Sequence, residues 1–523
     1  MIWKSVTVAS SLFNNVTLRF SRNKIVEEQK SVPISKNIQK LSDKTNTSYE
    51  KMTVIPGGQL GESEASLEQG FAEWLTGDEL QTKKKEFLGK EEKYVEKSKK
   101  VVISKLSLQQ RSRFLVSSLI DATSSGSQLL RLEEICKHLL LYPEQKSTMC
   151  KAGLVRTALH MKCNSSDNAV RAQARCALSL VGYNESPKGH GIRILSIDGG
   201  GTRGIIAIEV LRQLEARTNK RIYELFDFMC GVSSGAVLSL LLGGLRLSLD
   251  ECEALYRRLS DEVFSQSSFW GTGRLMWSHA YYDTTMWVKV LKKTFGEKLL
   301  IDTCKEDFAP KLAAVSALMN LPHLQAFVFR NYDFPPHVQS YYRGSCRYRM
   351  WEAIRASGAA PGYFEEYCLD DYLHQDGGIM VNNPAALAIH EAQLLWPSDG
   401  IQCVMSLGSG RYIPPVQPNY TSTSLKTKVL KVIDSATDTE GVHVILNDLL
   451  SPDTYFRINP YLTEFFTLDE NRAEKLDQMK IDAQMYLRRN EYKFFNAIQT
   501  LCLKRGSFKK VKDWISVRKD MLL

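Results

Sequence analysis

GIRILSIDGGGTRG, residues 191–204, marks the change of pattern that decides the fold. An apolar, largely β-branched run from Ile192 to Ile197 ends at Asp198 and a glycine-rich loop. The next stretch, IIAIEVLRQLEAR at 205–217, has apolar residues at helical spacing. The sequence therefore predicts a strand, a tight loop and a helix, which together are the repeating unit of an α/β fold.

A second stretch, FMCGVSSGAVLSLLLGGL at 228–245, carries no charge and fits either a membrane anchor or a buried segment. A membrane span needs about 20 apolar residues, whereas this run has 18 residues, four of them glycine. A strand over 223–230, a turn and a helix over 236–245 explain it better, because a strand buried on both faces is equally apolar. With further strands predicted at 311–320, 324–332 and 401–410, we expect an α/β layered fold with a central, mainly parallel sheet.

The turn in this run contains Gly-x-Ser-x-Gly, with Ser233 between Gly231 and Gly235. In a nucleophile elbow of this pattern the serine lies at the tip of a sharp strand-to-helix turn, where small neighbours allow close approach. The start of the following helix favours developing negative charge. The motif alone is weak evidence, because many buried turns match it.

A nucleophilic serine needs a base, and LHQDGGIMVNNP at 373–384 offers the carboxylate of Asp376. Gly377 and Gly378 permit close approach there, although an Asp-Gly turn is often only a surface turn. A histidine base is the chemical rival. His374 precedes Asp376 by two residues and His390 follows it by 14, so either could serve as the base of a Ser, Asp, His triad. A structural or exposed role is the commoner one for either residue.

The glycine-rich loop has two possible uses. Its glycines are Gly199, Gly200, Gly201 and Gly204. They match the dinucleotide-binding pattern Gly-x-Gly-x-x-Gly, for which Asp227 is the candidate ribose ligand. Alternatively, the first three amides form an oxyanion hole beside the serine. Arg203 then either contacts a phosphate head group or pairs with a surface acid.

Three motifs in this order, DGGGTRG, GVSSG and DGG, resemble those of the patatin-like phospholipases, with SHAYYD, AIRASGAAPGYF and VNNPAALAIHEA as supporting stretches. The resemblance implies a patatin-like three-layer fold with its core at 195–390. It implies that Ser233 is the nucleophile of a Ser-Asp dyad, that Asp376 is its base, and that Gly199 to Gly201 form the oxyanion hole.

The resemblance also implies an activity, which is hydrolysis of fatty acyl esters in membrane glycerophospholipids. No Asp-x-Asp-x-Asp-Gly calcium loop occurs in the sequence, which fits a calcium-independent enzyme without metal or other cofactor. A catalytically silent lipid-binding or scaffold protein of the same fold is the alternative.

The 523 residues are 43% hydrophobic and 24% charged, a globular composition. Residues 1–100 are predicted to be a disordered targeting segment and linker. The first 24 residues include basic and no acidic residues, which is typical of a mitochondrial transit peptide. Residues 101–188 predict a helical layer, 191–455 the patatin-like catalytic domain, and 456–523 a basic helical segment.

The distribution of charge indicates a possible membrane contact. Residues 481–523 hold 10 Lys or Arg against 4 Asp or Glu, which contributes +6 of the net charge of +10. Apolar residues from Phe494 to Trp514 interleave with these lysines, so an interfacial helix is one interpretation and packing of its first half is another. We expect a phospholipid membrane surface as partner, and neither nucleic acid nor metal.

The 11 cysteines lack zinc spacing and indicate reduced thiols inside the cell. Mitochondria or the endoplasmic reticulum are the expected membranes. Peroxisomes are doubtful, because the chain ends in KDMLL and not in Ser-Lys-Leu.

Overall fold

A computed structural model gives the fold for residues 104–264, 282–413 and 439–522. The predicted targeting segment and linker at 1–100 lie outside the described residues. Within these ranges, nine strands form one sheet. They are β1 (Ile192–Ile197), β2 (Phe228–Val232), β3 (Lys311–Leu318), β4 (Gln325–Arg330), β5 (Arg343–Ser345), β6 (Tyr367–Leu369), β7 (Tyr372–Asp376), β8 (Ile401–Leu407) and β9 (Tyr455–Ile458).

The sheet is mixed and mostly parallel, as predicted. Its main path runs β5-β4-β3-β2-β1-β8-β9, and β7 pairs with β3. β1, β2, β3, β8 and β9 are mutually parallel, whereas β4 and β7 are antiparallel to β3. The chain proceeds from β1 to β3 in one direction and returns beside β1 with β8. Loops at the carboxyl ends of parallel strands next to such a reversal commonly form ligand sites in α/β sheets.

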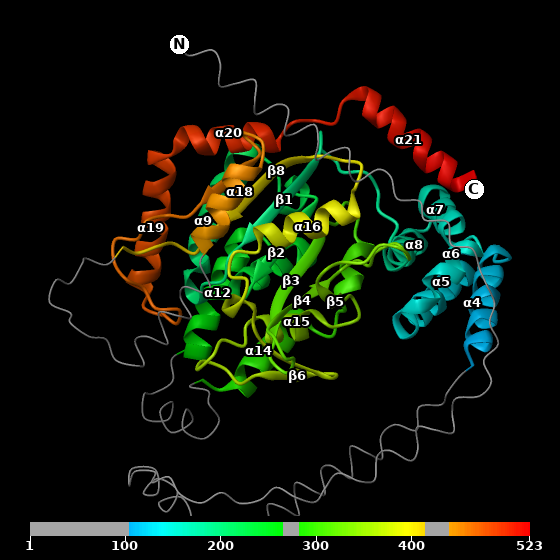
Figure 1. The fold of residues 1–523 in the computed structure, drawn as a ribbon, viewed down its shortest axis with the longest axis horizontal. Coiled ribbons are helices and arrows are strands. Elements are labelled where there is room, and N and C mark those ends of the chain that lie inside the picture. The colour runs from blue at the N-terminus through cyan, green and yellow to red at the C-terminus, as the bar shows by residue number, and fades with distance from the viewer. Residues whose placement is uncertain (1–103, 265–281, 414–438, 523) are drawn as a thin grey trace, which may run out of the picture. The chain divides into compact units, whose positions relative to one another are not determined.

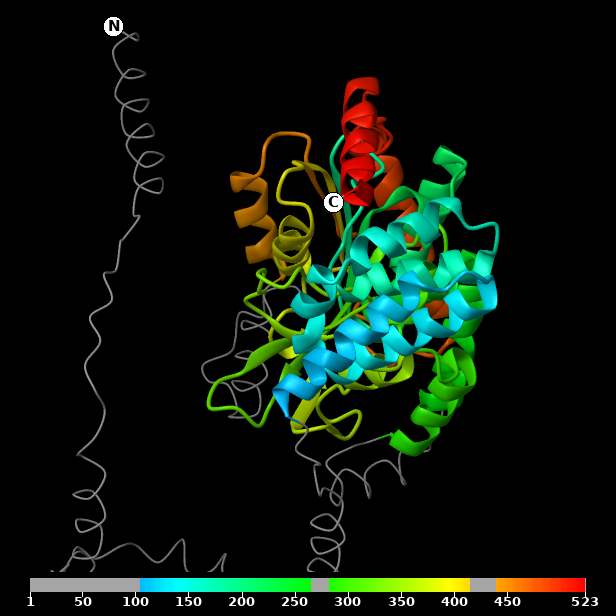
Figure 2. The ribbon, with the colours of Figure 1, turned by 90° about the vertical axis from the view of Figure 1, so that its right-hand side faces the viewer.

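Helices cover both faces of the sheet (Figures 1 and 2). Strand residues alternate between two apolar clusters, so that Leu195 and Met229 face one helical layer while Ile194 and Phe228 face the other. The helices of this part are α9 (Gly204–Thr218), α10 (Ile222–Leu225), α11 (Ser234–Leu240), α12 (Leu249–Phe264), α14 (Thr284–Phe295), α15 (Met350–Ser357), α16 (Ala385–Leu395) and α18 (Thr439–Leu449). The layers are thus helix, sheet and helix.

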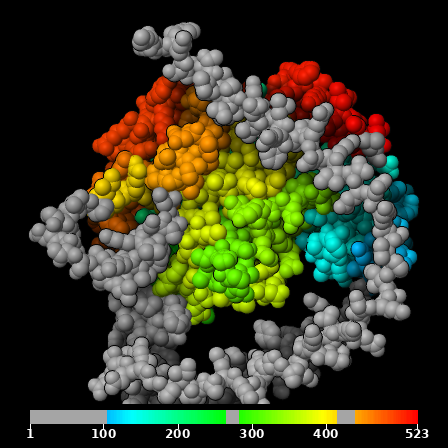
Figure 3. Space-filling view, in the orientation of Figure 1, coloured from blue at the N-terminus to red at the C-terminus, as the bar shows by residue number. Residues whose placement is uncertain are grey.

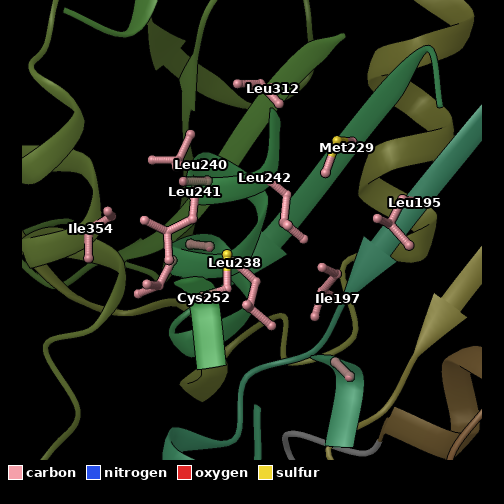
Figure 4. Packing of buried hydrophobic residues seen from close by; sticks show 14 of the residues in the cluster. Leu195, Ile197, Met229, Leu238, Leu240, Leu241, Leu242, Cys252, Leu312 and Ile354 are labelled. Carbon is pink, nitrogen blue, oxygen red and sulfur yellow. The ribbon is translucent and has the colours of Figure 1, made fainter. Parts of the chain in front are cut away.

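The uncharged run at 228–245 is a buried strand-turn-helix segment. It comprises β2, the elbow, α11 and one π-helical turn at Leu241–Leu245. Figure 4 shows Leu238 of α11 beside Ile197 and Cys252, which come from β1 and α12. Among the described residues no helix is both long enough and apolar enough to span a bilayer. The run is therefore apolar because it is the centre of the core.

The predicted strand at 223–230 is wrong in its first half. Residues 222–225 form the single helical turn α10, and β2 begins at Phe228. The turn is stabilised at its start, where the Glu224 carboxylate accepts the backbone N–H of Arg221 at 2.8 Å and Glu215 accepts that of Ile222 at 2.9 Å. Capping contacts of this kind outweigh the β propensity of the apolar residues.

Helices also precede and follow the sheet. The first group is α4 (Lys105–Ile120), α5 (Ser125–Leu141), α6 (Lys146–Lys151), α7 (Leu154–Asn164) and α8 (Asn168–Leu180). It has an apolar core of its own, to which Ile301, Cys304 and Cys346 of the sheet region contribute. The last group is α19 (Ala473–Arg489), α20 (Glu491–Leu501) and α21 (Ser507–Leu522). In the space-filling view α21, in red, lies above the cyan helices, and it contacts α7 (Figure 3).

Candidate active site

Ser233 lies between β2 and α11 in a backbone conformation that L-residues rarely adopt, with φ 53° and ψ −122°. The glycines around it make this turn possible. A Cβ on Gly231 would lie 2.1 Å from the carbonyl oxygen of Gly235, and a Cβ on Gly235 would lie 2.3 Å from that of Ile197. Both glycines are therefore required by contact, and the turn has the geometry expected of a nucleophile elbow.

Asp376 ends β7, which pairs with β3 next to the elbow. Its side chain accepts the backbone N–H of Gly378 at 2.8 Å. Burial raises the pKa of Asp376 to about 6, although interaction with the Ser233 hydroxyl and the Gly378 N–H lowers it. No Lys or Arg of the described residues forms an ion pair with this carboxylate. It is thus ionised at neutral pH and close to its proton-accepting range.

The glycine loop lies beside the elbow. A Cβ on Gly199 would lie 3.2 Å from the Cβ of Ser233. The amide of Gly199 donates to the Asn382 carbonyl at 3.4 Å, and that of Gly200 donates to the Ser234 hydroxyl at 3.1 Å. Two of the three predicted oxyanion donors are therefore engaged within the protein, and a substrate oxygen would have to replace these contacts.

Contacts at both ends of the glycine loop fix its position. Asp198, at the end of β1, forms a bidentate pair with Arg457 of β9, at 2.9 and 2.6 Å. Gly201 has φ 57°, and a Cβ there would lie 2.0 Å from the carbonyl oxygen of Leu468. A Cβ on Gly204 would lie 2.6 Å from the ring of Tyr256. These contacts explain glycine at 201 and 204 in physical terms.

Arg203 is a cation without an anionic partner among the described residues. Its Nε donates to the carbonyl of Gly200 at 3.3 Å, and burial lowers its pKa. A half-buried guanidinium in the glycine loop that lacks a carboxylate partner is available to bind an anion.

The two histidine alternatives have other partners in the structure. The Nδ1 of His374 is 2.8 Å from the hydroxyl of Ser316, and burial lowers its pKa to about 4. The Nε2 of His390 accepts the backbone N–H of Tyr341. Neither imidazole has a hydrogen bond to Ser233 among the described residues, whereas the Ser233 hydroxyl is close enough to Asp376 to lower the pKa of that carboxyl.

Asp227, the candidate ribose ligand, is fully occupied. Its carboxylate binds the Arg193 guanidinium twice at 2.9 Å and also accepts two backbone N–H groups. A dinucleotide would find no free acid there, so the loop pattern does not indicate nucleotide binding. The described residues also hold no group of three or more His, Cys, Asp or Glu side chains that could bind a metal ion.

Residues 195–389 match the family model described as patatin-like phospholipase. The chain thus carries a domain of the patatin-like phospholipase family, and this agrees with the helix-sheet-helix layers and the elbow. It is 44% identical over 498 residues to calcium-independent phospholipase A2-gamma of Oryctolagus cuniculus, covering 94% of this chain and 63% of that protein.

Other relatives follow the same pattern. The protein of the same name from Homo sapiens is 46% identical over 432 residues, which cover 82% of this chain and 55% of that protein. Phospholipase A I of Arabidopsis thaliana is 29% identical over 490 residues, covering 77% of this chain and 36% of its own length. The chain therefore spans between half and two thirds of the length of the gamma proteins.

Proposed function

We propose that this protein is a lipid acyl hydrolase, which cleaves fatty acyl esters of membrane glycerophospholipids without calcium. The observation that carries the proposal is that Ser233, in a strained turn after β2, interacts with the buried carboxylate of Asp376 in a patatin-like domain. A buried carboxylate with a pKa of about 6 and no ion pair in the described part of the chain is suited to accept a proton at neutral pH.

The reaction has two halves. The Oγ of Ser233 attacks the ester carbonyl while Asp376 takes the hydroxyl proton, and the proton then leaves with the lysophospholipid alcohol. Water attacks the resulting acyl-enzyme, again giving its proton to Asp376, and the fatty acid departs as Ser233 is restored. Amides of Gly199 to Gly201 stabilise the oxyanion in both halves once substrate has displaced their present contacts.

The test is fatty acid release from liposomes by the full chain, in excess calcium chelator, using a phospholipid with distinguishable sn-1 and sn-2 chains. We expect release by the parent and none by Ser233→Ala. Ser239→Ala, which changes a buried serine of α11 six residues after Ser233, is the matched control and should retain release. A folded parent that releases nothing contradicts the proposal, and the released chain identifies the position of attack.

A silent lipid-binding protein of the same fold is the second candidate, favoured by the engaged amides of Gly199 and Gly200. It predicts liposome binding by the parent without release of fatty acid. Binding would then be unchanged in Ser233→Ala.

For the head group, we assign the phosphate contact to Arg203, since its guanidinium has no anionic partner among the described residues. Arg203→Gln should raise KM for phospholipid while leaving hydrolysis of a short uncharged ester near the parent value. Equal effects on both substrates would contradict a phosphate contact.

Contact with the bilayer is also proposed for α21. The helix is held by Met521, which packs on the apolar core of the first helices, and by polar contacts in which Asp513 pairs with Arg505 and Asp520 accepts the hydroxyl of Tyr183. Phe508 and Ile515 remain exposed. The helix starts beside the amino end of β1, since Lys504 forms a β-bridge with Gly189. The amino end of β1 lies at the opposite end of the parallel strands from Ser233, which follows the carboxyl end of β2. A membrane-bound α21 would therefore tether the protein without delivering substrate.

Reversal of the charges at Lys510 and Lys512 should weaken binding to anionic liposomes several-fold at low salt. Hydrolysis of a dispersed monomeric ester should not change. Unaltered liposome binding contradicts the tether. The membrane itself, mitochondrial or of the endoplasmic reticulum, is to be assigned by fractionating cells that express the full chain.

A further inference from the structure

One short segment at the end of α15, residues 357–359, contacts both members of the Ser233–Asp376 pair. The backbone N–H of Ser233 donates to the hydroxyl of Ser357 at 2.9 Å. Two residues later, the carbonyl of Ala359 accepts the backbone N–H of Asp376 at 3.0 Å. Ser357 and Ala359 are both fully buried, so water does not substitute for these contacts. The segment belongs to AIRASGAAPGYF, a motif whose sequence does not reveal its role.

The hydroxyl of Ser357 stands where two strands separate. The parallel pairing of β2 and β3 ends at Val232 and Val315. Immediately beyond it, the Ser357 hydroxyl accepts from Ser233 and donates to the carbonyl of Val315 at 2.6 Å. It thereby bridges the two strands. A Cβ on Gly377 would lie 2.3 Å from this same carbonyl, so the turn after Asp376 packs on the bridge as well.

The bridge matters because the backbone of Ser233 is in an unfavourable conformation. A non-glycine residue at φ 53° persists only where its surroundings fix it. The carbonyl of Ser233 is fixed by the amides of Ala236 and Val237. On the other side of the residue, Ser357 supplies the hydrogen bond to the N–H. Removing that hydroxyl takes the partner from the N–H of Ser233 and from the buried carbonyl of Val315, and the turn is free to relax.

We propose that Ser357 is a positioning residue for the nucleophile, whose hydroxyl holds the backbone turn of Ser233 so that its Oγ faces Asp376. The inference rests on the proposed hydrolase function and assigns to Ser357 no contact with substrate. It adds to the pair a third residue, which acts through the main chain of Ser233.

The decisive variant is Ser357→Ala, measured in the full chain by two reactions of Ser233. These are phosphonylation by a small fluorophosphonate and release of fatty acid from phosphatidylcholine liposomes. We expect both rates to fall about 100-fold with KM within twofold, because a displacement of about 1 Å at a nucleophile has an effect of that size. Ser112→Ala is the matched control. Its hydroxyl is equally buried and hydrogen-bonded but lies in α4.

The pH profile separates positioning from general loss of structure. Interaction with the Ser233 hydroxyl lowers the pKa of Asp376. If Ser357→Ala moves Ser233 away, the acid limb of phosphonylation shifts to higher pH, whereas simple unfolding lowers the amplitude at every pH without moving the limb. Circular dichroism at the assay temperature establishes the folded fraction.

A parent that is neither phosphonylated at Ser233 nor able to release fatty acid overturns the proposed function itself. A reactive parent with Ser357→Ala within threefold of its rates overturns only the role of Ser357. If Ser357→Ala does not fold, Ser357→Cys replaces it, because a thiol keeps the shape but is a poor acceptor. A Ser357→Cys rate within threefold of the parent then overturns the inference.

Discussion

Two buried carboxylates at the ends of different strands both have a pKa raised by burial, but their partners differ. Burial raises the pKa of Asp198, after β1, to about 6, and it raises that of Asp376, after β7, to about 6 as well. Asp198 is paired with Arg457 through two hydrogen bonds. Asp376 has the hydroxyl of Ser233 and one backbone N–H.

The difference separates a group that holds the site together from one that can react. Arg457 also donates to Ser406 and Glu440, so its pair with Asp198 joins β1, β8, β9 and α18 behind the glycine loop. A proton on Asp198 would break this pair. Among the described residues Asp376 has no ion pair to lose when it is protonated, and the side chain that interacts with it is the Ser233 hydroxyl. Similarly raised pKa values therefore do not imply equal roles, because the partners of the two carboxylates differ.

The largest expected effect is on turnover in Asp376→Asn. The amide keeps the size and can still accept from Gly378, but it cannot take the proton of Ser233. We expect kcat to fall by about 10²- to 10⁴-fold, the usual contribution of a general base. Fatty acid release from liposomes measures it. Retention of more than a tenth of parent activity in a folded variant would show that Asp376 is not the base.

Breaking the ion pair between Asp198 and Arg457 should lower the stability of the fold. In Arg457→Met the charge of Asp198 remains buried without its partner, which should lower the free energy of unfolding by about 3–5 kcal/mol. Urea unfolding at pH 7 measures this. Arg131→Met is the matched control, because it removes a partly exposed ion pair with Glu134 and should cost at most about 1 kcal/mol. Equal losses in the two variants would contradict the distinction.

The pH dependence of Asp376 follows from its raised pKa. The folded form holds the proton more tightly than the unfolded chain, whose ordinary value is 3.8. This carboxyl therefore favours folding below about pH 4, and that contribution is lost as pH rises through 6. A shift of about two units corresponds to roughly 3 kcal/mol.

Asp376→Asn should accordingly stabilise the fold at pH 7 by up to about 3 kcal/mol, with no gain at pH 4, as measured by urea unfolding at both values. In the parent, turnover should fall about tenfold per pH unit below 6, since only the ionised carboxylate accepts a proton. Stabilisation of equal size at both pH values would contradict the assignment of this pKa to Asp376.

The sequence alone identifies Asp376 as a candidate base, but it does not reveal that Asp198 forms a structural ion pair. Ser233 and Asp376 belong to short motifs with glycines that the backbone requires, so local pattern identifies them. Arg457 lies 259 residues from Asp198 and is brought to it only by the pairing of β8 with β9. No spacing in the sequence encodes that contact. Likewise, the predicted parallel sheet follows from apolar runs, whereas the partners of the Gly199 and Gly200 amides depend on tertiary packing.

The smallest expected effect concerns His374, two residues before Asp376. If a histidine were the base, Asp376 would orient an imidazole and would resemble Asp198 in being committed to a partner. His374 is instead bound to Ser316 and packed against Phe327, and burial lowers its pKa to about 4, so it is neutral at pH 7. The double variant His374→Gln, His390→Gln should therefore keep fatty acid release within about threefold, since neither residue transfers a proton. Phosphonylation of Ser233 at its parent rate in this variant would leave Asp376 as the group that activates the serine. A phosphonylation rate at least 100-fold lower in a folded variant would instead make Asp376 a structural carboxylate like Asp198.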